Sequence, residues 1–279
     1  MGKEKLASLE INRIYHMDCL EGMKLIPDKS IDMILCDLPY GTTKCKWDTI
    51  IPFESLWEQY RRIIKKDGVI ALTGSQPFTS ELIHSNLEWF REHLVWVKHK
   101  PSNFARGKYM HLRYHEDIVI FCNGKPTYTP QMQERKSERV KQMQKGKSKK
   151  WNTVRQDGEE VSCRTLFQPK EWTEYNADKK YPSTILEIPA VNSNSKEKTK
   201  HPTQKPVALF EYLIRTYTNG GDVVLDNCIG SGTTAEAALN TKRRFLGFET
   251  ESKYIEIANQ RIENTYCKIA DQKLLNTTQ

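Results

Sequence analysis

The sequence predicts an α/β protein built on an open, Rossmann-like, mostly parallel sheet with helices on both faces. Two observations support this: short apolar runs recur along the chain, and helical patterns separate most of them. A short apolar run bounded by turn residues is typical of a buried strand, and strands alternating with helices favour parallel pairing. The sheet is expected to have seven strands, at residues 11–16, 31–37, 69–74, 94–97, 117–122, 223–226 and 245–249.

Three longer segments carry the spacing of an amphipathic helix. In each, apolar residues recur every three to four positions and fall on one helical face. The segments are residues 53–64, 207–217 and 254–262. Residues 65–68, which end on a glycine, are expected to terminate the first helix. No helical pattern separates the runs 94–97 and 117–122, so this pair is expected to form an antiparallel hairpin at the sheet edge.

The net charge and the cysteine content narrow the class of binding partner and the cellular compartment. The chain has 279 residues and a net charge of +8, which favours an anionic partner such as nucleic acid. Its seven cysteines form no Cys-x-x-Cys pair, which favours reduced thiols in the cytoplasm over disulfides or a zinc ribbon. No apolar run approaches the roughly 18 residues of a membrane span, so no membrane association is expected.

The regular pattern stops in the middle of the chain. Residues 134–150 hold eight Lys or Arg against two Glu, without an apolar stripe. Residues 125–199 are therefore expected to form a basic insert, while residues 1–124 and 200–279 together form the main domain. A charge run of this kind is also typical of a solvated or disordered surface.

The first motif that carries chemistry is Asp37-Leu38-Pro39-Tyr40, directly after the strand 31–36. Ligands of open α/β sheets bind at the carboxyl ends of the strands. The motif delivers a carboxylate, a conformationally fixed proline and an aromatic ring to that edge. This combination suits a pocket for a flat ring that carries an exocyclic amine.

The second motif is a strand, a glycine-rich turn and a helix. The strand 223–226 is followed by the turn 227–234 and a helical segment from 235, and Glu249 ends the next strand. Glycines let the backbone approach a ligand, and a carboxylate at that strand end can accept hydrogen bonds from ribose hydroxyls. The turn alone suits either NAD or S-adenosylmethionine. The first motif favours S-adenosylmethionine, because hydride transfer gives no reason for Asp-x-Pro-Tyr at a neighbouring strand end.

Together the motifs resemble those of the S-adenosylmethionine-dependent DNA amino-methyltransferases, in the permuted group whose catalytic motif precedes its cofactor motif. Residues 37–40 resemble Asp-Pro-Pro-Tyr, residues 226–234 resemble Asp-Pro-Phe-x-Gly-Ser-Gly-Thr-Thr, and residues 201–206, His-Pro-Thr-Gln-Lys-Pro, match the segment that precedes the cofactor turn. The resemblance covers about residues 9–124 and 200–265. Leu38, Asn227 and Ile229 depart from the family pattern.

The resemblance implies a circularly permuted methyltransferase fold, S-adenosylmethionine as cofactor and a set of site residues. The catalytic residues would be Asp37, Leu38, Pro39 and Tyr40. Lys205 would lie near the cofactor carboxylate and Asp18 near the adenosine end. The full cofactor set is Asp18, His201, Thr203, Lys205, Asp226, Cys228, Gly230, Ser231, Gly232, Thr233, Thr234 and Glu249.

The implied reaction is methylation of an exocyclic amine in double-stranded DNA. An Asp37 oxygen and the Pro39 carbonyl would accept the two N–H bonds of a flipped-out base, and Tyr40 would stack on that base. Asp rather than Ser at position 37 favours the N6 amine of adenine over the N4 amine of cytosine, by analogy with the family. No metal is expected, because no third ligand completes the pair His111 and His115.

Several DNA contacts are expected outside the catalytic motif. Lys44, Lys46 and Trp47 would line the DNA side of the pocket. The insert would contact phosphates through Arg135, Lys136, Arg139, Lys141, Lys145, Lys147, Lys149 and Lys150. Among many candidate base readers are Trp151, Arg155, Arg164 and Asn176.

Other partners and functions stay open at this point. A homodimer and a cognate restriction endonuclease are further partner hypotheses. The competing functions are a cytosine-N4 methyltransferase, a methyltransferase of RNA or of a protein amide, a DNA-binding module with a decayed site, and an NAD oxidoreductase. Protein amide methyltransferases usually carry Asn in place of Asp37, which argues against that alternative.

Overall fold

The computed structural model describes residues 4–43, 45, 47–134, 153–154, 160–161 and 179–277. The chain forms two compact units, residues 1–129 with 183–279 and residues 130–182. In the second unit the described residues form two short antiparallel pairs. These are β8 (Gln133–Glu134) with β11 (Lys179–Lys180), and β9 (Thr153–Val154) with β10 (Glu160–Val161). Residues 183–199, expected in the insert, belong to the first unit.

The first unit is built on a mixed sheet of eight strands, in the order β12-β6-β7-β5-β4-β13-β14-β3. Strand β7 runs antiparallel to both its neighbours, and the other pairs are parallel. The strands are β3 (Arg13–His16), β4 (Ile31–Cys36), β5 (Ile64–Gly74), β6 (Phe90–Val97), β7 (His115–Phe121), β12 (Ile185–Glu187), β13 (Val223–Asp226) and β14 (Arg244–Glu249). A mostly parallel α/β sheet is thus confirmed.

The expected number of seven strands is wrong, because β12 adds an eighth. This strand pairs parallel to β6, with Leu186 opposite Trp96. It has three residues and one buried side chain, so its sequence carries no apolar run. The β6–β7 hairpin is antiparallel as expected, but β12 rather than β6 forms that edge of the sheet.

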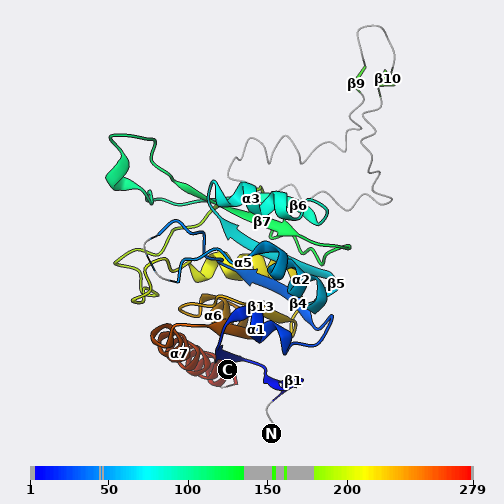
Figure 1. Cartoon of the computed structure of the whole chain (residues 1–279), viewed down its shortest axis with the longest axis vertical. Coiled ribbons are helices and arrows are strands. Elements are labelled where there is room, and N and C mark those ends of the chain that lie inside the picture. Colours follow the sequence, from blue (N-terminus) through cyan, green and yellow to red (C-terminus); the bar gives the residue numbers. More distant parts are fainter. Residues whose placement is uncertain are drawn as a thin grey trace. The chain divides into compact units, whose positions relative to one another are not determined.

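Helices cover both faces of the sheet (Figure 1). One face packs against α5 (Val207–Tyr217), α6 (Thr233–Asn240) and α7 (Ser252–Thr277). The other packs against α1 (Cys19–Lys24), α2 (Phe53–Ile63) and α3 (Phe78–Ser85). Strand residues alternate between the two cores: Met33 and Leu35 join the first, Ile34 and Cys36 the second.

Local differences from the sequence prediction concern short elements. Helix α2 ends at Ile63 and the chain enters β5 at Ile64, so residues 65–68 are strand rather than a helix terminator. Helices α1 and α3 have only six and eight residues, too few for a clear periodic pattern. A turn of 3-10 helix, η1 (Phe104–Arg106), lies in the β6–β7 connection, and β1 (Lys5–Leu6) pairs with β2 (Leu9–Glu10) before the sheet begins.

The centre of the sheet creates the position for a site. Strands β4 and β13 are parallel neighbours, with Ile34 opposite Leu225. From β4 the chain continues through α2 to β5 on one side, and from β13 through α6 to β14 on the other. The two connections diverge and leave a crevice at the carboxyl ends of β4 and β13. No helix among the described residues combines the length and apolar character needed to cross a bilayer.

Gly22 supplies a test of this packing. A Cβ at Gly22 would lie 2.4 Å from Cε1 of Phe248, a fully buried ring of β14. Gly22→Ala should lower the unfolding free energy by about 1–2 kcal/mol, because overpacking outweighs the gain in helix propensity. Urea denaturation measures this. Gly220→Ala is the control, since a Cβ there meets nothing within 4 Å; equal losses in both variants would contradict the packing argument.

Candidate active site

Residues of both predicted motifs line one cleft of about 1310 Å³ in the first unit. Asp37 and Tyr40 follow β4, Gly230 and Ser231 follow β13, and Glu249 ends β14. The two motifs, far apart in the sequence, therefore meet at the carboxyl edge of the sheet.

Both carboxylate oxygens of Asp37 are hydrogen-bonded. The Tyr40 hydroxyl lies 2.7 Å from Oδ1 and 2.8 Å from Oγ1 of Thr73, and Thr73 donates to the same Oδ1. Lys205 Nζ donates to Oδ2 at 2.7 Å. Since Oδ1 meets two hydroxyls and Oδ2 one ammonium, Oδ2 retains capacity for one further donor.

Lys205 belongs to a chain of four alternating charges. Its Nζ lies 2.7 Å from Asp37 Oδ2 and 3.3 Å from Glu116 Oε2, and Lys98 Nζ lies 2.6 Å from Glu116 Oε1. Burial opposes the charge of Lys205, yet Asp37 and Glu116 raise its pKa above the ordinary value. Burial would likewise raise the pKa of Glu116, but the two lysines outweigh it and hold that pKa below its ordinary value. Lys205 and Glu116 are therefore expected to be charged at neutral pH.

The sequence prediction put Lys205 near the cofactor carboxylate. Its ammonium pairs with Asp37, and its side chain lines the same cleft as the glycine turn. Thr73, Lys98 and Glu116 were not expected at the site. They lie at the ends of β5, β6 and β7, all at the same edge of the sheet.

The other residues of the Asp37 motif have distinct surroundings. Leu38 is only 4% exposed and packs in the core, which explains why this position accepts leucine. The Pro39 carbonyl accepts no hydrogen bond in the described part of the chain and lines the cleft with the rest of the motif. The Tyr40 ring packs 5.1 Å from Phe78, and burial and Asp37 raise the pKa of its hydroxyl. Pro39 thus offers an acceptor beside the one on Asp37.

Asp48 fixes the loop that follows this motif. Its Oδ1 accepts from the backbone N–H of Gly41 at 2.9 Å, and its Oδ2 from those of Thr42 and Thr43 at 2.9 and 2.6 Å. Burial would raise the pKa of Asp48, but these hydrogen bonds outweigh it and lower that pKa. The loop that leaves Tyr40 is therefore held by an ionised carboxylate that sequence patterns did not single out.

In the glycine turn after β13 the backbone adopts conformations that favour glycine. Gly230 and Gly232 have φ of +50° and +81°. A Cβ on Gly230 would lie 3.1 Å from His201 Nε2, and one on Gly232 would lie 2.8 Å from the Ala258 side chain of α7. Neither position accommodates a larger residue without strain. The first N–H groups of α6, from Thr233, follow this turn and have no partner within the helix.

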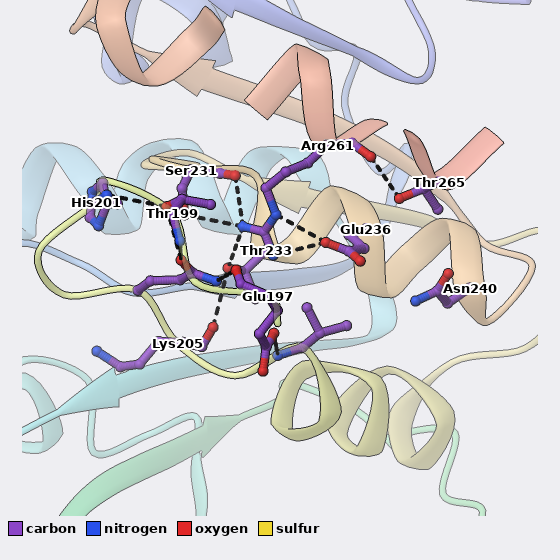
Figure 2. Close-up of polar contacts among 12 residues, drawn as sticks. Glu197, Thr199, His201, Lys205, Ser231, Thr233, Glu236, Asn240, Arg261 and Thr265 are labelled. Carbon is purple, nitrogen blue, oxygen red and sulfur yellow. Dashed lines mark hydrogen bonds and ion pairs between the residues drawn. The ribbon is translucent and has the colours of Figure 1, made fainter. Parts of the chain in front are cut away.

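Arg261 of α7 braces the turn (Figure 2). Its Nη1 donates to the Ser231 carbonyl at 2.8 Å and to Thr233 Oγ1 at 3.2 Å, and its Nη2 pairs with Glu236 Oε2 at 2.8 Å. Thr233 Oγ1 in turn donates to the Lys205 carbonyl at 3.3 Å. In Figure 2 the Lys205 side chain extends away from this cluster. The backbone of Lys205 thus contacts the glycine turn while its ammonium reaches Asp37.

Asp18 and Glu249 lie at the ends of neighbouring strands. Glu249 Oε1 accepts from the N–H groups of Thr250 and Glu251, and Oε2 from that of Gly230 at 2.9 Å. One lone pair of Oε2 stays available for a ligand hydroxyl. Asp18 is the N-cap of α1, with Oδ1 accepting from Leu20 N–H at 2.9 Å.

His201 lies over the glycine turn in an aromatic cluster. Its ring lies 4.3 Å from that of Tyr254 and 5.8 Å from that of Trp47. Burial lowers its pKa to about 4, and its buried Nδ1 has no hydrogen-bond partner in the part of the chain that the structure describes. Trp47, which was expected to line the DNA side of the pocket, lies beside the rings of His201 and Tyr254 and lines the cleft. Thr203 is exposed and lines the same cleft.

Asp226 anchors the start of the turn. Its Oδ2 accepts from Thr234 Oγ1, and its Oδ1 accepts from the Cys228 N–H at 3.0 Å. Burial raises its pKa to about 7 despite these hydrogen bonds. Asn227, which departs from the family pattern, accepts a 2.6 Å hydrogen bond from the buried Tyr60 hydroxyl. Ile229 packs on Gly247, where a Cβ would lie 2.4 Å from its Cδ1.

The predicted insert contacts cannot be located in the structure. The basic residues Arg135, Lys136, Arg139, Lys141, Lys145, Lys147, Lys149 and Lys150 lie outside the described residues, as do Lys44 and Lys46. No group of three or more His, Cys, Asp or Glu that could hold a metal ion occurs among the described residues.

Known proteins match this chain along most of its length. A family model described as DNA methylase, for N6 and N4 methyltransferases, matches residues 31–260. The DNA adenine methyltransferase YhdJ of Escherichia coli is 28% identical over 268 residues, which cover 91% of this chain and 83% of that relative. The type II methyltransferase M.BglII of Bacillus subtilis is 30% identical over 268 residues, 90% of this chain and 68% of its own.

Solved structures agree with the sequence relatives. The M1.HpyAVI–SAM complex superposes with a TM-score of 0.57 at 25% identity, covering 90% of this chain and 98% of that one. The cytosine-N4-specific PvuII DNA methyltransferase superposes with a TM-score of 0.60 over 92% of each chain. At 17% identity this second match shows a similarity of fold alone.

Lys205→Met tests the charge chain. The variant leaves two largely buried carboxylates, Asp37 and Glu116, without the cation between them. Its unfolding free energy should fall by about 3–5 kcal/mol in urea denaturation. Lys24→Met, which breaks a pair with Glu21 in which both side chains are more than half exposed, is the control and should change the unfolding free energy far less. A loss below about 1 kcal/mol for Lys205→Met would show that the charge chain does not stabilise the folded protein.

Asp226→Asn tests the buried carboxyl through pH. The folded-state pKa of Asp226, about 7, lies above the ordinary 3.8. Between these two pH values the folded protein therefore keeps a proton on Asp226 that the unfolded chain has released. The contribution of Asp226 to stability should therefore fall as pH rises from about 4 to 7. The unfolding free energy of wild type minus that of the variant, measured at pH 5.0 and 7.5, should decrease. Asp28→Asn, at a carboxylate 71% exposed, controls for the lost charge. A difference that is constant or rises would contradict the assignment.

Proposed function

The chain belongs to the N6/N4 DNA methylase family, and from that premise we propose that it methylates the N6 amine of adenine in duplex DNA. It is a DNA methyltransferase that uses S-adenosylmethionine. The observation that carries the adenine proposal is the Asp37 carboxylate, with an open acceptor position on Oδ2, in one cleft with the glycine turn. The relative YhdJ, named as an adenine methyltransferase, supports the same choice of base.

The glycine turn fits the cofactor. Gly230 and Gly232 adopt positive φ, the buried Nδ1 of His201 has no partner among the described residues, and Glu249 Oε2 retains one lone pair. The residues proposed to hold the adenosine part are Asp18 and Glu249, and those for the methionine part are the turn 228–234 with His201 and Thr203. When bound, the cofactor supplies an electrophilic methyl group on a sulfonium.

The Asp37 motif is proposed to prepare the amine for that methyl group. The exocyclic amine of adenine is a weak nucleophile because its lone pair is delocalised into the ring. Asp37 Oδ2 and the Pro39 carbonyl would accept its two N–H bonds and favour a pyramidal nitrogen. The rate would then come from orientation and preorganised acceptors, without a covalent intermediate.

The charge chain is proposed to preorganise that acceptor. The hydroxyls on Oδ1 and the Lys205 ammonium on Oδ2 fix the plane of the Asp37 carboxylate. The carboxylate therefore needs no reorientation when the amine arrives. Glu116 and Lys98 act further away, because Glu116 pairs with Lys205 and Lys98 pairs with Glu116.

The wider partners follow from the same proposal. A flipped base requires duplex DNA with phosphate contacts, and the eight basic residues of the insert are proposed to supply some of them. A homodimer and a cognate endonuclease stay predictions. A decayed site is disfavoured, because Asp37, Pro39, Tyr40, Gly230, Gly232 and Glu249 all keep the residue types of the family motifs.

Asp37→Ala tests the function in cells. The chain and the variant are expressed in a bacterial host without its own DNA methyltransferases, and the DNA is analysed by nucleoside mass spectrometry and long-read sequencing. Wild type should yield N6-methyladenine at one sequence motif, and Asp37→Ala should lower turnover at least about 10²-fold. Asp271→Asn, at an exposed position of α7, should match wild type. N4-methylcytosine alone would replace adenine by cytosine in the proposal, and no methylation would overturn it.

A further inference from the structure

One surface segment borders the cleft and, apart from Lys98 at its start, has no role in the chemistry described so far. Residues 98–114 connect β6 to β7 and project beyond the carboxyl edge of the sheet, seen in Figure 1 as the green segment with one helical turn. Phe104, Arg106 and Met110 of this segment line the cleft that holds Asp37. The segment is therefore beside the site where a flipped base would enter.

The segment exposes large apolar side chains. Phe104 is 79% exposed and Tyr109 is 87% exposed, and Met110 and Tyr114 are each more than 40% exposed. Isolated apolar residues on a surface are ordinary, but a group of four on one loop beside a cleft is typical of a binding surface.

The loop is held in shape rather than left open. The side chain of Asn103 bridges it, donating to the His111 carbonyl at 3.0 Å and accepting from the Arg113 N–H at 2.7 Å. Arg113 Nη1 donates to Ser75 Oγ at 2.7 Å and ties the loop to the end of β5. Phe104 starts the turn η1 within this frame. A ring presented by a fixed frame loses little conformational entropy on binding.

The charge of the segment identifies the partner. Residues 99–114 contain four Lys or Arg and no Asp or Glu, whereas Lys98 before them is buried and paired with Glu116. Arg106 and Lys108, on either side of Gly107, are both exposed. Exposed rings interleaved with basic side chains suit a polyanion with stackable bases, and duplex DNA combines both properties.

We propose that residues 98–114 form a second DNA-contact element, in which Phe104 inserts into the base stack vacated by the target base while Arg106 and Lys108 contact the flanking phosphates. Extrusion of a base leaves a gap, and apolar side chains that enter such gaps offset the unstacking cost. The inference rests on the proposed function, since it assigns the DNA surface of that same site.

The wedge is tested by substrate rescue. Phe104→Ala is assayed for methyl transfer to a duplex oligonucleotide carrying the motif found by sequencing. A second duplex has an abasic site opposite the target base, which lowers the cost of flipping. The variant should lose about 5- to 100-fold in kcat/KM on the paired duplex. On the abasic duplex the loss should shrink to less than about threefold. Tyr266→Ala, an exposed aromatic of α7, should match wild type on both.

The phosphate contacts are tested by salt dependence. Arg106→Gln with Lys108→Gln should reduce the slope of log Kd against log salt by about 1.8 for the paired duplex, while Lys268→Gln on α7 should leave it unchanged. An unchanged slope would overturn this part of the proposal.

The outcomes separate this inference from the proposed function. Equal losses of Phe104→Ala on both duplexes, no loss on either, or a more than tenfold weaker affinity for S-adenosylmethionine would overturn the wedge. In each case wild-type methylation of adenine would leave the proposed function intact. If wild type methylates cytosine instead, the adenine proposal fails and the same two duplexes, built on that base, still test the wedge.

Discussion

The ion pair between Lys205 and Asp37 connects the two halves of the site. Asp37 follows β4, and Lys205 precedes α5 in the segment that contacts the glycine turn through its carbonyl. One residue therefore pairs with the Asp37 carboxylate through its ammonium and contacts the glycine turn through its backbone. In the proposed reaction this residue would link the part of the site that holds the methyl donor to the part that holds the acceptor base.

The fold could be predicted because its strands are regular and buried. The seven apolar runs all correspond to strands, and the alternation of Met33 and Leu35 with Ile34 and Cys36 reflects a sheet covered on both faces. Strand β12 could not be predicted, because three residues with one buried side chain carry no periodic pattern. Its pairing depends on β6, which lies far away in the sequence.

The site was predicted where local motifs carry it and missed where tertiary contacts do. Asp37, Gly230 and Glu249 stand in recognisable spacings at strand ends. Thr73, Glu116 and Lys98 are single polar residues at the ends of other strands, and their meeting with Asp37 and Lys205 depends on the strand order. One usable signal existed: Lys98 and Glu116 stand as opposite charges at the two ends of the same connection, next to buried runs.

The reversed direction of β7 has a consequence for how the fold can acquire new surfaces. In a wholly parallel sheet, the first residues of each strand stay at the amino edge, remote from any ligand. Because β7 enters from the opposite edge, its opening residues join the reactive side, and the crossover from β6 needs no return helix. The part of this crossover between Asn103 and Arg113 can thus lengthen, shorten or change composition without disturbing the layers beneath. Variation among relatives in how they engage their polymer can accumulate there while the chemistry stays constant.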